Sequence, residues 1–424
     1  MGVSRVVSPE GIDLSATAFW HRPPAERAEA FEVLRREAPV SWQRPPESVL
    51  IEPEESSGGY WAVVRHEHVR AVSRDPETFC SGRGVMLEDA PQELLDAAQS
   101  FLPMDAPRHT KLRGLVQKAF SPHQVKRISE QITGHALRIV DELESELGSG
   151  AELDFVERVS KRLPMMTLWG MMGVPEAERD RLTERADELV SWNDPEVVGD
   201  REPAELLFNG ILELTAAALE LAGERRSEPV DDLMSALVAA EVDGERLADE
   251  EISSFFVLLA VAGNDTTRHT TSHAMRALCE FPEQRALLAE DLPGRIEGAV
   301  EEFVRWASPV MTFRRTATRD TELGGQAIAE GEKVVLFYTA ANRDPAAFPD
   351  PERFDVLRAP NRHVGFGGGG PHYCLGAALA RTQLRSIFTE LLTRLPELEV
   401  GEPEPLIGNF VNGVKRMPAW VGAR

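Results

Sequence analysis

One cysteine follows a run of four glycines and precedes a predicted helix. Cys374 ends this segment, which begins at Phe366 and passes through Gly370, Pro371 and His372. Glycine lets a backbone approach a bulky group closely, and a helix N-terminus favours an anion. Because these features lower the pKa of a thiol, and the thiolate is the form that binds metals, the segment predicts a thiolate at Cys374.

Three interpretations of Cys374 are open from this segment alone. It could be a metal ligand, a nucleophile activated by the nearby His372, or an inert buried residue, as we expect for Cys80 and Cys279. A phosphate-binding loop is disfavoured, because such a loop needs Gly-Lys-Ser/Thr where this chain has Gly-Pro-His.

A second group of polar residues lies in the middle of a long apolar stretch, Leu247–Phe281. The stretch contains no proline, and as a helix it would be about 50 Å long, so we expect it to cross the molecule. Gly263 weakens a helix by about 1 kcal/mol and Thr266 can donate to the Ala262 carbonyl, which predicts a local opening. Asp265 beside this hydroxyl could relay protons. A packing kink with a solvated carboxylate is an equally good interpretation.

A third group is a possible ion-pair cluster. Glu302 and Arg305 are three residues apart on a predicted helix and therefore share a face. A proline-rich segment downstream fixes an extended path and brings a second arginine, Arg353, within possible reach. We expect a Glu–Arg–Arg cluster of Glu302, Arg305 and Arg353, although such pairs carry little specificity alone.

The elements that position these groups are mostly helical. Apolar residues recur at spacings of three and four in six long stretches, whereas strand patterns are few and short. The expected fold class is therefore mainly α with a small β portion (α+β). The predicted helices are Ser121–Leu147, Pro175–Trp192, Glu205–Arg226, Leu247–Phe281, Pro293–Ala307 and Leu375–Leu395. The predicted strands are Tyr60–Val64, Thr312–Thr318, Lys333–Tyr338 and a terminal pair around Phe410 and Ala419–Val421.

Composition narrows the class of protein. The 424 residues contain no linker, repeat or low-complexity tract, so we expect one domain over residues 1–424. Three cysteines suit a reducing compartment, and neither a signal peptide nor a membrane-inserted segment is indicated, so we expect a cytoplasmic protein. A net charge of −24 argues against nucleic acid as a partner.

Two stretches depart from this acidic balance. Residues 106–129 and 356–389 contain no Asp or Glu. If they meet in space, they form a basic patch that could attract an acidic partner; scattered surface charge is an equally good interpretation. The basic residues are Arg108, Lys111, Arg113, Lys118, Lys126 and Arg127 in the first stretch, and Arg358, Arg362, Arg381 and Arg385 in the second.

The order of these motifs resembles that of the bacterial cytochrome P450 family of haem-thiolate monooxygenases. Ala262–Thr267, the Glu-x-x-Arg pair, the Pro-Glu-Arg-Phe segment ending at Phe354 and the glycine loop follow one another as in that family. The resemblance covers nearly the whole chain and includes Met104–His109 and Asn342–Asp344. It implies the P450 fold, with haem between the long central helix and the loop that carries Cys374.

The resemblance also implies the roles of individual residues. Cys374 would be the axial thiolate, and thus the metal ligand, of haem b. Asp265 and Thr266 match the acid–alcohol pair that delivers protons. The structural cluster would be the Glu302, Arg305 and Arg353 group. The other haem-binding residues would be Ala262, Phe366 and Gly376, together with His109, Arg113, Arg315 and His372 at the propionates.

The implied activity is hydroxylation of a hydrophobic small molecule with O2. Electrons would come from a ferredoxin, itself reduced by an NAD(P)H-dependent reductase, that docks on the basic stretches. The implied pocket is apolar. Its residues would be Val85, Met86, Leu87, Phe101, Leu102, Leu258, Ala262, Val310, Met311, Phe313, Phe410 and Val411.

One departure from the family pattern points to a branch. The phenylalanine before the cysteine usually lies seven residues upstream, whereas here Gly367 holds that position and Phe366 lies eight upstream. The longer loop is similar to the actinobacterial branch that oxidises steroids and methyl-branched lipids, so such a substrate is expected. The alternatives are an enzyme that tailors a polyketide or macrolide, a peroxide-driven peroxygenase and a haem sensor without catalysis.

Overall fold

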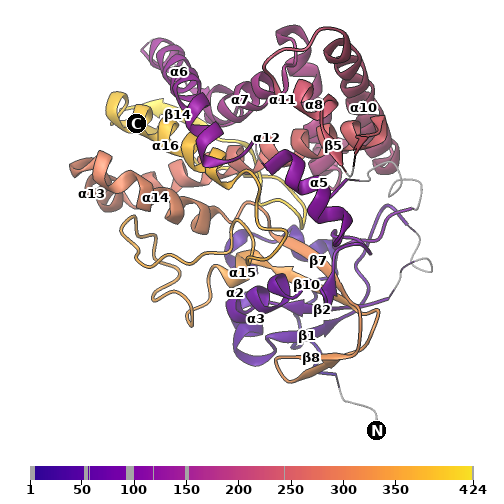
Figure 1. Ribbon diagram of the computed structural model, residues 1–424. Coiled ribbons are helices and arrows are strands. Elements are labelled where there is room, and N and C mark those ends of the chain that lie inside the picture. Colours follow the sequence, from indigo (N-terminus) through magenta and orange to yellow (C-terminus); the bar gives the residue numbers. More distant parts are fainter. Residues whose placement is uncertain are drawn as a thin grey trace.

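The computed structural model separates a helical half from a half built around a five-stranded sheet (Figure 1). It describes residues 5–51, 56, 58–91, 100–117, 119–148, 152–242 and 244–422. The sheet lies toward the N-terminus in this view, and the C-terminal strand lies among the helices.

Helices account for most of the described elements, as the sequence predicts, and all six predicted long helices are present. The long helices are α2 (Pro24–Glu37), α3 (His66–Arg74), α5 (Arg108–Gln117), α6 (Pro122–Leu147), α7 (Arg162–Met172), α8 (Glu176–Ser191), α10 (Pro203–Ser227), α12 (Asp249–Glu280), α13 (Pro282–Glu290), α14 (Leu292–Ala307) and α16 (Ala377–Arg394). The short ones are α1 (Thr17–Trp20), a π-helix (Val156–Ser160), α9 (Pro195–Val198), α11 (Leu233–Val238) and α15 (Tyr338–Ala341).

The five-stranded sheet joins distant parts of the chain. Its order is β1-β2-β10-β7-β3, where β10 runs parallel to β2 and antiparallel to β7. Its strands are β1 (Val40–Gln43), β2 (Tyr60–Val63), β3 (Phe79–Cys80), β7 (Thr312–Ala317) and β10 (Lys333–Phe337). The smaller sheets contain β4 (Leu153–Asp154), β5 (Glu241–Val242), β6 (Glu245–Arg246), β8 (Thr321–Leu323), β9 (Gln326–Ile328), β11 (Leu398–Val400), β12 (Glu404–Pro405), β13 (Val414–Arg416) and β14 (Pro418–Val421).

The predicted terminal strand pair is wrong in its partner. β14 pairs with β11 and β4, and Phe410 lies in no strand. Instead, the turn around Phe410 reaches the start of β7, where Val411 forms an isolated bridge with Val310 and the Met311 amide donates to the Phe410 carbonyl over 2.7 Å. The turn is therefore fixed beside the large sheet.

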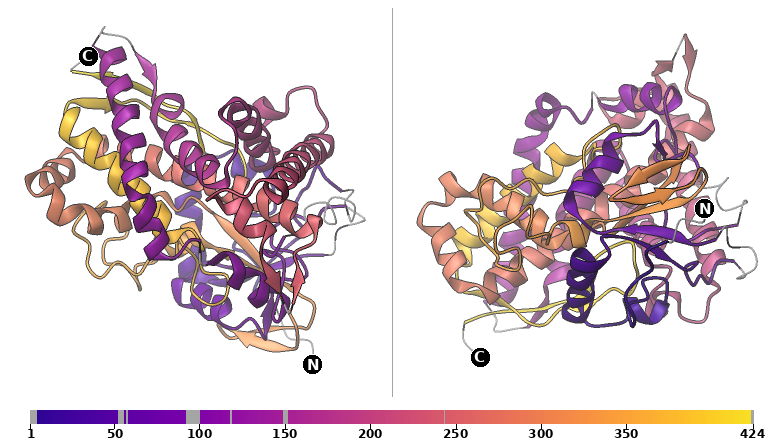
Figure 2. Two further views of the ribbon diagram at one scale, coloured as in Figure 1. Left: turned by 45° about the horizontal axis from the view of Figure 1, so that its top comes forward. Right: turned by 90° about the horizontal axis from the view of Figure 1, so that it is seen from below.

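Helix α12 passes through the helical half and packs on α7, α8, α10 and α14. Its 32 residues correspond to about 48 Å, and further views show helices around it (Figure 2). The helix is continuous through Gly263, so the predicted local opening is absent. A Cβ at Gly263 would lie 3.1 Å from Leu168 Cδ2, which shows that this glycine permits close packing of α12 on α7.

One described helix, α10, is long and apolar enough to cross a membrane by length and composition alone. It packs against α8 and α12 in this structure. Leu207, Ile211 and Leu214 of its inward face are buried in the helical half, whereas Phe208, Leu212 and Leu219 on the same helix are exposed.

Candidate functional site

The glycine loop owes its path to helix α3. Gly367, Gly369 and Gly370 have φ values of +99°, +99° and +76°, which L side chains rarely adopt. A Cβ at Gly370 would also collide with the Ser73 carbonyl, and Arg74 Nε donates to the Gly368 carbonyl over 3.2 Å. The glycines thus permit the loop to pack on α3, a structural need that the sequence interpretation did not include.

Cys374 is presented at the end of this loop. Its amide donates to the Phe366 carbonyl over 2.9 Å, so the loop is closed although it is one residue longer than usual. Phe366 is buried, with the Arg381 guanidinium 4.4 Å from its ring centroid. The loop therefore holds Phe366 in place with a cation–π contact.

The expected lowering of the Cys374 pKa is not found in the protein alone. The side chain has exposed surface, yet the chain encloses it closely enough that burial raises the pKa of the thiol. The Gly376 amide and the guanidinium groups of Arg113 and Arg381 oppose this shift. Desolvation disfavours the anion, and in the protein alone only these three groups oppose it.

Four basic side chains gather beside Cys374, as the family resemblance implies. The rings of His109 and His372 have centroids 4.2 Å apart. Burial, followed by the charges of Arg315, His109 and Arg113, lowers the pKa of His372 to about 3. Among the described residues, no ion pair links these four side chains to an acid, and His109 Nε2 is buried without a partner. This excess of donors fits two propionate groups.

One face of α12 has exposed surface near the middle of the helix. Ala262 is exposed although it lies in the core helix, and Thr266, one turn later, donates its hydroxyl to the Ala262 carbonyl over 3.0 Å. This confirms the predicted hydrogen bond. Exposed surface on both Ala262 and Cys374 fits a flat group such as haem, which the family resemblance places between them.

Asp265 lies on the adjacent face of α12 and is fully buried. Its Oδ1 accepts from Arg268, whose Nη1 also donates to both oxygens of Asp187 over 3.0 Å. Burial raises the pKa of Asp265, the Arg268 charge opposes the rise and Asp187 adds to it. Asp187 also pairs with Lys161, and both side chains are partly exposed. The chain of ion pairs from Asp265 through Arg268 to Asp187 therefore connects a buried carboxyl to the surface. Asp265 itself is not the solvated carboxylate of the alternative interpretation.

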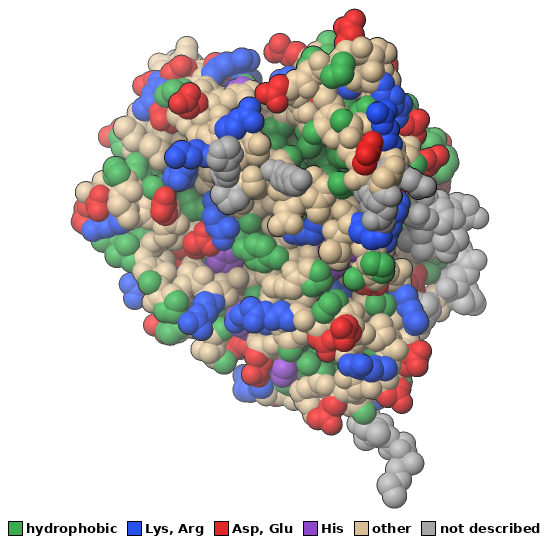
Figure 3. Space-filling view, viewed as in Figure 1, with side chains coloured by type: hydrophobic (Ala, Val, Ile, Leu, Met, Phe, Trp, Pro, Cys, Tyr) green, Lys and Arg blue, Asp and Glu red, His purple; other side chains and the backbone are tan. Residues whose placement is uncertain are grey.

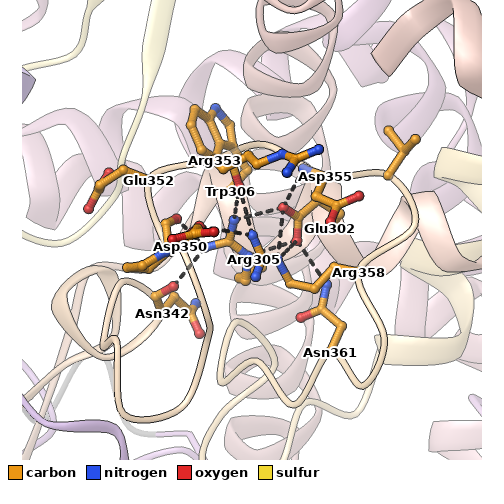
Figure 4. Close-up of polar contacts among 12 residues, drawn as sticks. Glu302, Arg305, Trp306, Asn342, Asp350, Glu352, Arg353, Asp355, Arg358 and Asn361 are labelled. Carbon is orange, nitrogen blue, oxygen red and sulfur yellow. Dashed lines mark hydrogen bonds and ion pairs between the residues drawn. The ribbon is translucent and has the colours of Figure 1, made fainter. Parts of the chain in front are cut away.

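The predicted ion-pair cluster forms around Glu302, which is completely buried with Arg305 (Figure 4). Arg305 Nε and Nη2 each donate to one Glu302 oxygen over 2.7 Å. This bidentate geometry is the strong form of such a pair. The Asn361 side-chain amide and the Asp355 backbone amide also donate to Glu302, over 3.0 Å and 2.9 Å.

Arg353 is not the second arginine of this cluster. Its residue is exposed and contributes its carbonyl, which accepts from Arg305 and Arg358. Arg358 supplies the second guanidinium, with Nε 3.2 Å and 3.3 Å from the two Glu302 oxygens. The Pro349–Phe354 segment runs past Glu302 with the Arg353 side chain directed away from the cluster. The chain then turns at Asp355, and this turn brings the Arg358 side chain to Glu302. The Arg358 side chain, which was assigned to the basic surface, is therefore in the core.

The predicted pocket residues divide into groups. Val310, Phe313, Phe410 and Val411 come together, with the two phenylalanine rings 5.6 Å apart and edge-on. Val85 joins them because its carbonyl accepts from the Arg314 amide over 2.7 Å. The other half-buried positions are Met86, Leu102 and Leu258.

Other predicted pocket residues have different neighbours. Met311, directly before β7, is buried in the core cluster that includes Leu14 and Trp20. Leu87 belongs to the same cluster and also lines a cavity of about 280 Å³. Phe101 stacks on Phe255, at a centroid distance of 5.6 Å, and lines a separate cavity of about 370 Å³.

The two basic stretches are only partly available at the surface. Lys118 lies outside the described residues. Several of the others pair with acids of the chain itself: Arg108 with Glu251, Arg127 with Asp231, Arg381 with Glu301 and Arg385 with Glu297. Arg362 of the second stretch lies instead near Arg70 and Arg74, two arginines that sequence reasoning missed. Burial and the charges of Arg74 and Arg362 lower the pKa of Arg70.

Known proteins resemble the chain over nearly its whole length. A family model described as Cytochrome P450 matches residues 204–411. The methyl-branched lipid omega-hydroxylase of Mycobacterium tuberculosis is 40% identical, over 96% of this chain and 94% of the relative. The steroid C26-monooxygenase of Mycolicibacterium smegmatis is 39% identical, over 96% and 93%. A solved structure of a Mycobacterium marinum cytochrome P450 in complex with pseudoionone is 54% identical, with a TM-score of 0.94, and covers 99% of this chain and 100% of that one.

Proposed function

This chain belongs to the cytochrome P450 family of haem-thiolate monooxygenases, and from that premise we propose that it hydroxylates a methyl-branched lipid or a steroid. The likeness to hydroxylases of both substrate classes over 96% of the chain carries the proposal. The apolar contact of Phe313 with Phe410 supports it, since an apolar lining binds hydrophobic ligands. The longer glycine loop pointed to the same branch.

A panel of ligands tests the substrate class. Steroids, branched fatty acids and macrolides would be titrated into the haem-loaded enzyme while its low-spin to high-spin absorption change is recorded. We expect the change with branched lipids or steroids. A response to macrolides alone would contradict the proposal and favour an enzyme that tailors natural products.

Haem b with an axial cysteine thiolate supplies the activation of dioxygen in this family. The chain itself provides the sulfur of Cys374, the basic group of His109, Arg113, Arg315 and His372 for the propionates, and the open face of α12 at Ala262. Each of these residues has the exposure or the missing anionic partner that such a role requires.

Asp265 and Thr266 would move protons toward the reacting centre. The Asp265 carboxyl, whose pKa is raised by burial, can hold a proton, and its Oδ2 has no partner among the described residues. The Arg268–Asp187 pair links it to the surface. The hydroxyl of Thr266 lies on the open face of the helix and could pass a proton onward by exchanging its bond to Ala262.

Substitution of this pair should separate electron use from product formation. In Thr266→Ala we expect electron consumption to continue while hydrogen peroxide replaces product, and in Asp265→Asn we expect turnover to fall by roughly 10²-fold. Thr271→Ala is the matched control, because Thr271 makes the same hydrogen bond to a residue four positions earlier, at 2.9 Å, and is buried. Full product yield in Thr266→Ala would refute the relay, and turnover supported by peroxide alone and unaffected by that change would favour the peroxygenase.

The redox partner that the family requires would be a ferredoxin, and we place its docking site around Arg70, Arg74 and Arg362. Helix α3 packs on the loop that bears Cys374, so these charges lie beside the electron acceptor. Lys and Arg side chains recur across the middle of the face that carries α5 (Figure 3), and such a field attracts an acidic partner. A ferredoxin and a thiolate both suit a reducing cytoplasm.

Charge reversal tests this docking site. Arg70→Glu combined with Arg362→Glu should lower ferredoxin-supported turnover by roughly tenfold or more at low ionic strength and weaken its salt dependence. Arg74 is left intact because it holds the glycine loop. Reduction of the double variant by dithionite should be unchanged. The control variant is Arg36→Glu on α2, where the exposed arginine pairs with Glu37; its ferredoxin-supported turnover should also be unchanged. An unaltered KM for ferredoxin in the double variant would place the docking site elsewhere.

A further inference from the structure

A cavity of about 280 Å³ lies between the N-terminal segment and two turns, 85–89 and 407–411. Its walls are largely apolar, but two polar side chains at its inner end are almost completely buried: Glu88 is 5% exposed and Asn409 is 7% exposed. The residues that matter for its chemistry are Trp20, Leu87, Glu88, Trp192, Ile407 and Asn409.

Two oxygen atoms in this cavity have no hydrogen-bond partner among the described residues. The Asn409 side-chain amide donates to Glu88 Oε1, and the side chain of Asn193, which also lines the cavity, contacts the Glu88 carboxyl. Glu88 Oε2 and Asn409 Oδ1 complete no hydrogen bond among the described residues. An unpaired buried polar group costs about 1–3 kcal/mol. Because both residues line the same cavity, one hydrogen-bond donor placed there could reach both side chains.

The same two turns carry predicted pocket residues. Leu87 precedes Glu88, and Phe410 follows Asn409 directly in the chain. Both turns are attached to β7: the Asn409 carbonyl accepts from Thr312 Oγ1 over 2.9 Å, and the Val85 carbonyl accepts from the Arg314 amide. The polar end of the cavity is therefore held rigidly beside the apolar group of Phe313 and Phe410.

We propose that Glu88 and Asn409 bind a hydroxyl group at one end of the substrate, so that the opposite, hydrocarbon end extends past Phe410 and Phe313 toward the Cys374 side. This inference rests on the proposed function, which it deepens by fixing the chemistry of the substrate's polar end. Two acceptor oxygens require a donor, which a hydroxyl has. A hydrocarbon would leave both unpaired, and a carboxylate has no proton to donate to Asn409 Oδ1.

The protonation of Glu88 is compatible with this ligand. Burial raises the pKa of Glu88, while its contacts with Asn409 and Asn193 and the charge of Arg314 oppose the rise. A hydroxyl can donate to the carboxylate or accept from the neutral acid, so it completes the hydrogen bonds in both forms. An anchored end also explains how an enzyme of this kind could select the terminal carbon at the other end of a flexible chain.

Three ligands with the same branched chain provide the test: phytanol, which has a hydroxyl end, phytane, which has none, and phytanic acid. Binding to the haem-loaded enzyme would be measured by calorimetry as well as by the spin-state change. We expect phytanol to bind about tenfold more tightly than phytane and more tightly than phytanic acid. In Glu88→Leu, phytanol affinity should fall to that of phytane, and phytane affinity should not fall.

Glu47→Gln is the matched control, because Glu47 lines the same cavity but its carboxylate is already satisfied. It accepts from the Thr17 amide over 2.8 Å and from Arg44 Nη2 over 2.6 Å. The preference for phytanol should therefore persist in this variant.

Two results would overturn the hydroxyl site. Equal affinities for phytanol and phytane in the unchanged enzyme would mean that water satisfies Glu88 and Asn409, and tightest binding of phytanic acid would mean that the cavity selects an anion. Product analysis distinguishes failure of the proposed function from failure of the hydroxyl site. If the enzyme binds phytanol with the expected preference but oxidises no ligand of the set, the proposed hydroxylase function is refuted and the hydroxyl site is supported. Oxidation of phytanol at the methyl end far from the hydroxyl, and a spread of positions in Glu88→Leu, would support both.

Discussion

Replacing Cys374 with serine is expected to leave a folded protein that lacks hydroxylase activity. The reduced carbon-monoxide complex should also lose the red-shifted absorption of thiolate-ligated haem. Folding should survive because the loop is closed through the backbone, by the Cys374 amide and the Phe366 carbonyl, and by glycine packing on α3. Activity should not survive, since a serine hydroxyl is not an anion near neutral pH and cannot supply the electron density of a thiolate.

The other two cysteines provide controls for this variant. Cys279 is half-buried, and burial raises its pKa to about 11, so Cys279→Ser should keep both the spectrum and the activity. Circular dichroism would show that each variant is folded before its spectrum is interpreted. A thiolate spectrum that persists in Cys374→Ser would show that the axial ligand has been misassigned. If the protein without any substitution folds but binds no haem, the monooxygenase assignment is refuted.

Replacing Glu302 with glutamine should destabilise the protein by about 3–5 kcal/mol, the cost of breaking a buried ion pair. Glutamine is similar in size, but it leaves the fully buried Arg305 without a counter-charge and weakens the bonds from Arg358, Asn361 and the Asp355 amide. Chemical denaturation followed by circular dichroism and by loss of haem would measure the effect. Glu297→Gln on the same helix should cost no more than about 1 kcal/mol, since Glu297 is exposed and 3.4 Å from Arg385.

Two alanine variants test the corrected membership of this cluster. Arg358→Ala should be strongly destabilising, because the Arg358 side chain is 7% exposed and contacts both Glu302 oxygens. Arg353→Ala should have little effect, because only the backbone carbonyl of Arg353 takes part in the cluster. The opposite ranking of the two variants would restore Arg353 to the cluster.

Much of the helical framework could be predicted from the sequence because its signals are local. Apolar spacing located α6, α8, α10, α12, α14 and α16 to within about two residues at each end. The Glu302–Arg305 pair was likewise predictable, since residues three apart on a helix share a face. The bond from Thr266 to Ala262 has the same local origin.

Contacts between distant segments could not be predicted in this way. The partner of the C-terminal strand was wrong because several strands offer similar edges, and the choice among them depends on where the chain returns. Met311 was predicted to line the pocket, and only the tertiary structure shows that it is buried in the core cluster that includes Trp20. Glu88 was not singled out at all, because an acid beside a leucine has no sequence signal until Asn409 is brought to it.

By itself, the sequence determined the mainly helical fold, the family and the cysteine that would hold the haem, because these depend on residue types at fixed spacing. Only the tertiary structure decided that Arg358 takes the place expected of Arg353 and that the glycines accommodate α3. It also decided that burial raises the pKa of the Cys374 thiol. The physical reason is the same in each case: side-chain burial, pKa and pairing depend on what packs against a residue, and those neighbours lie tens or hundreds of positions away in the chain.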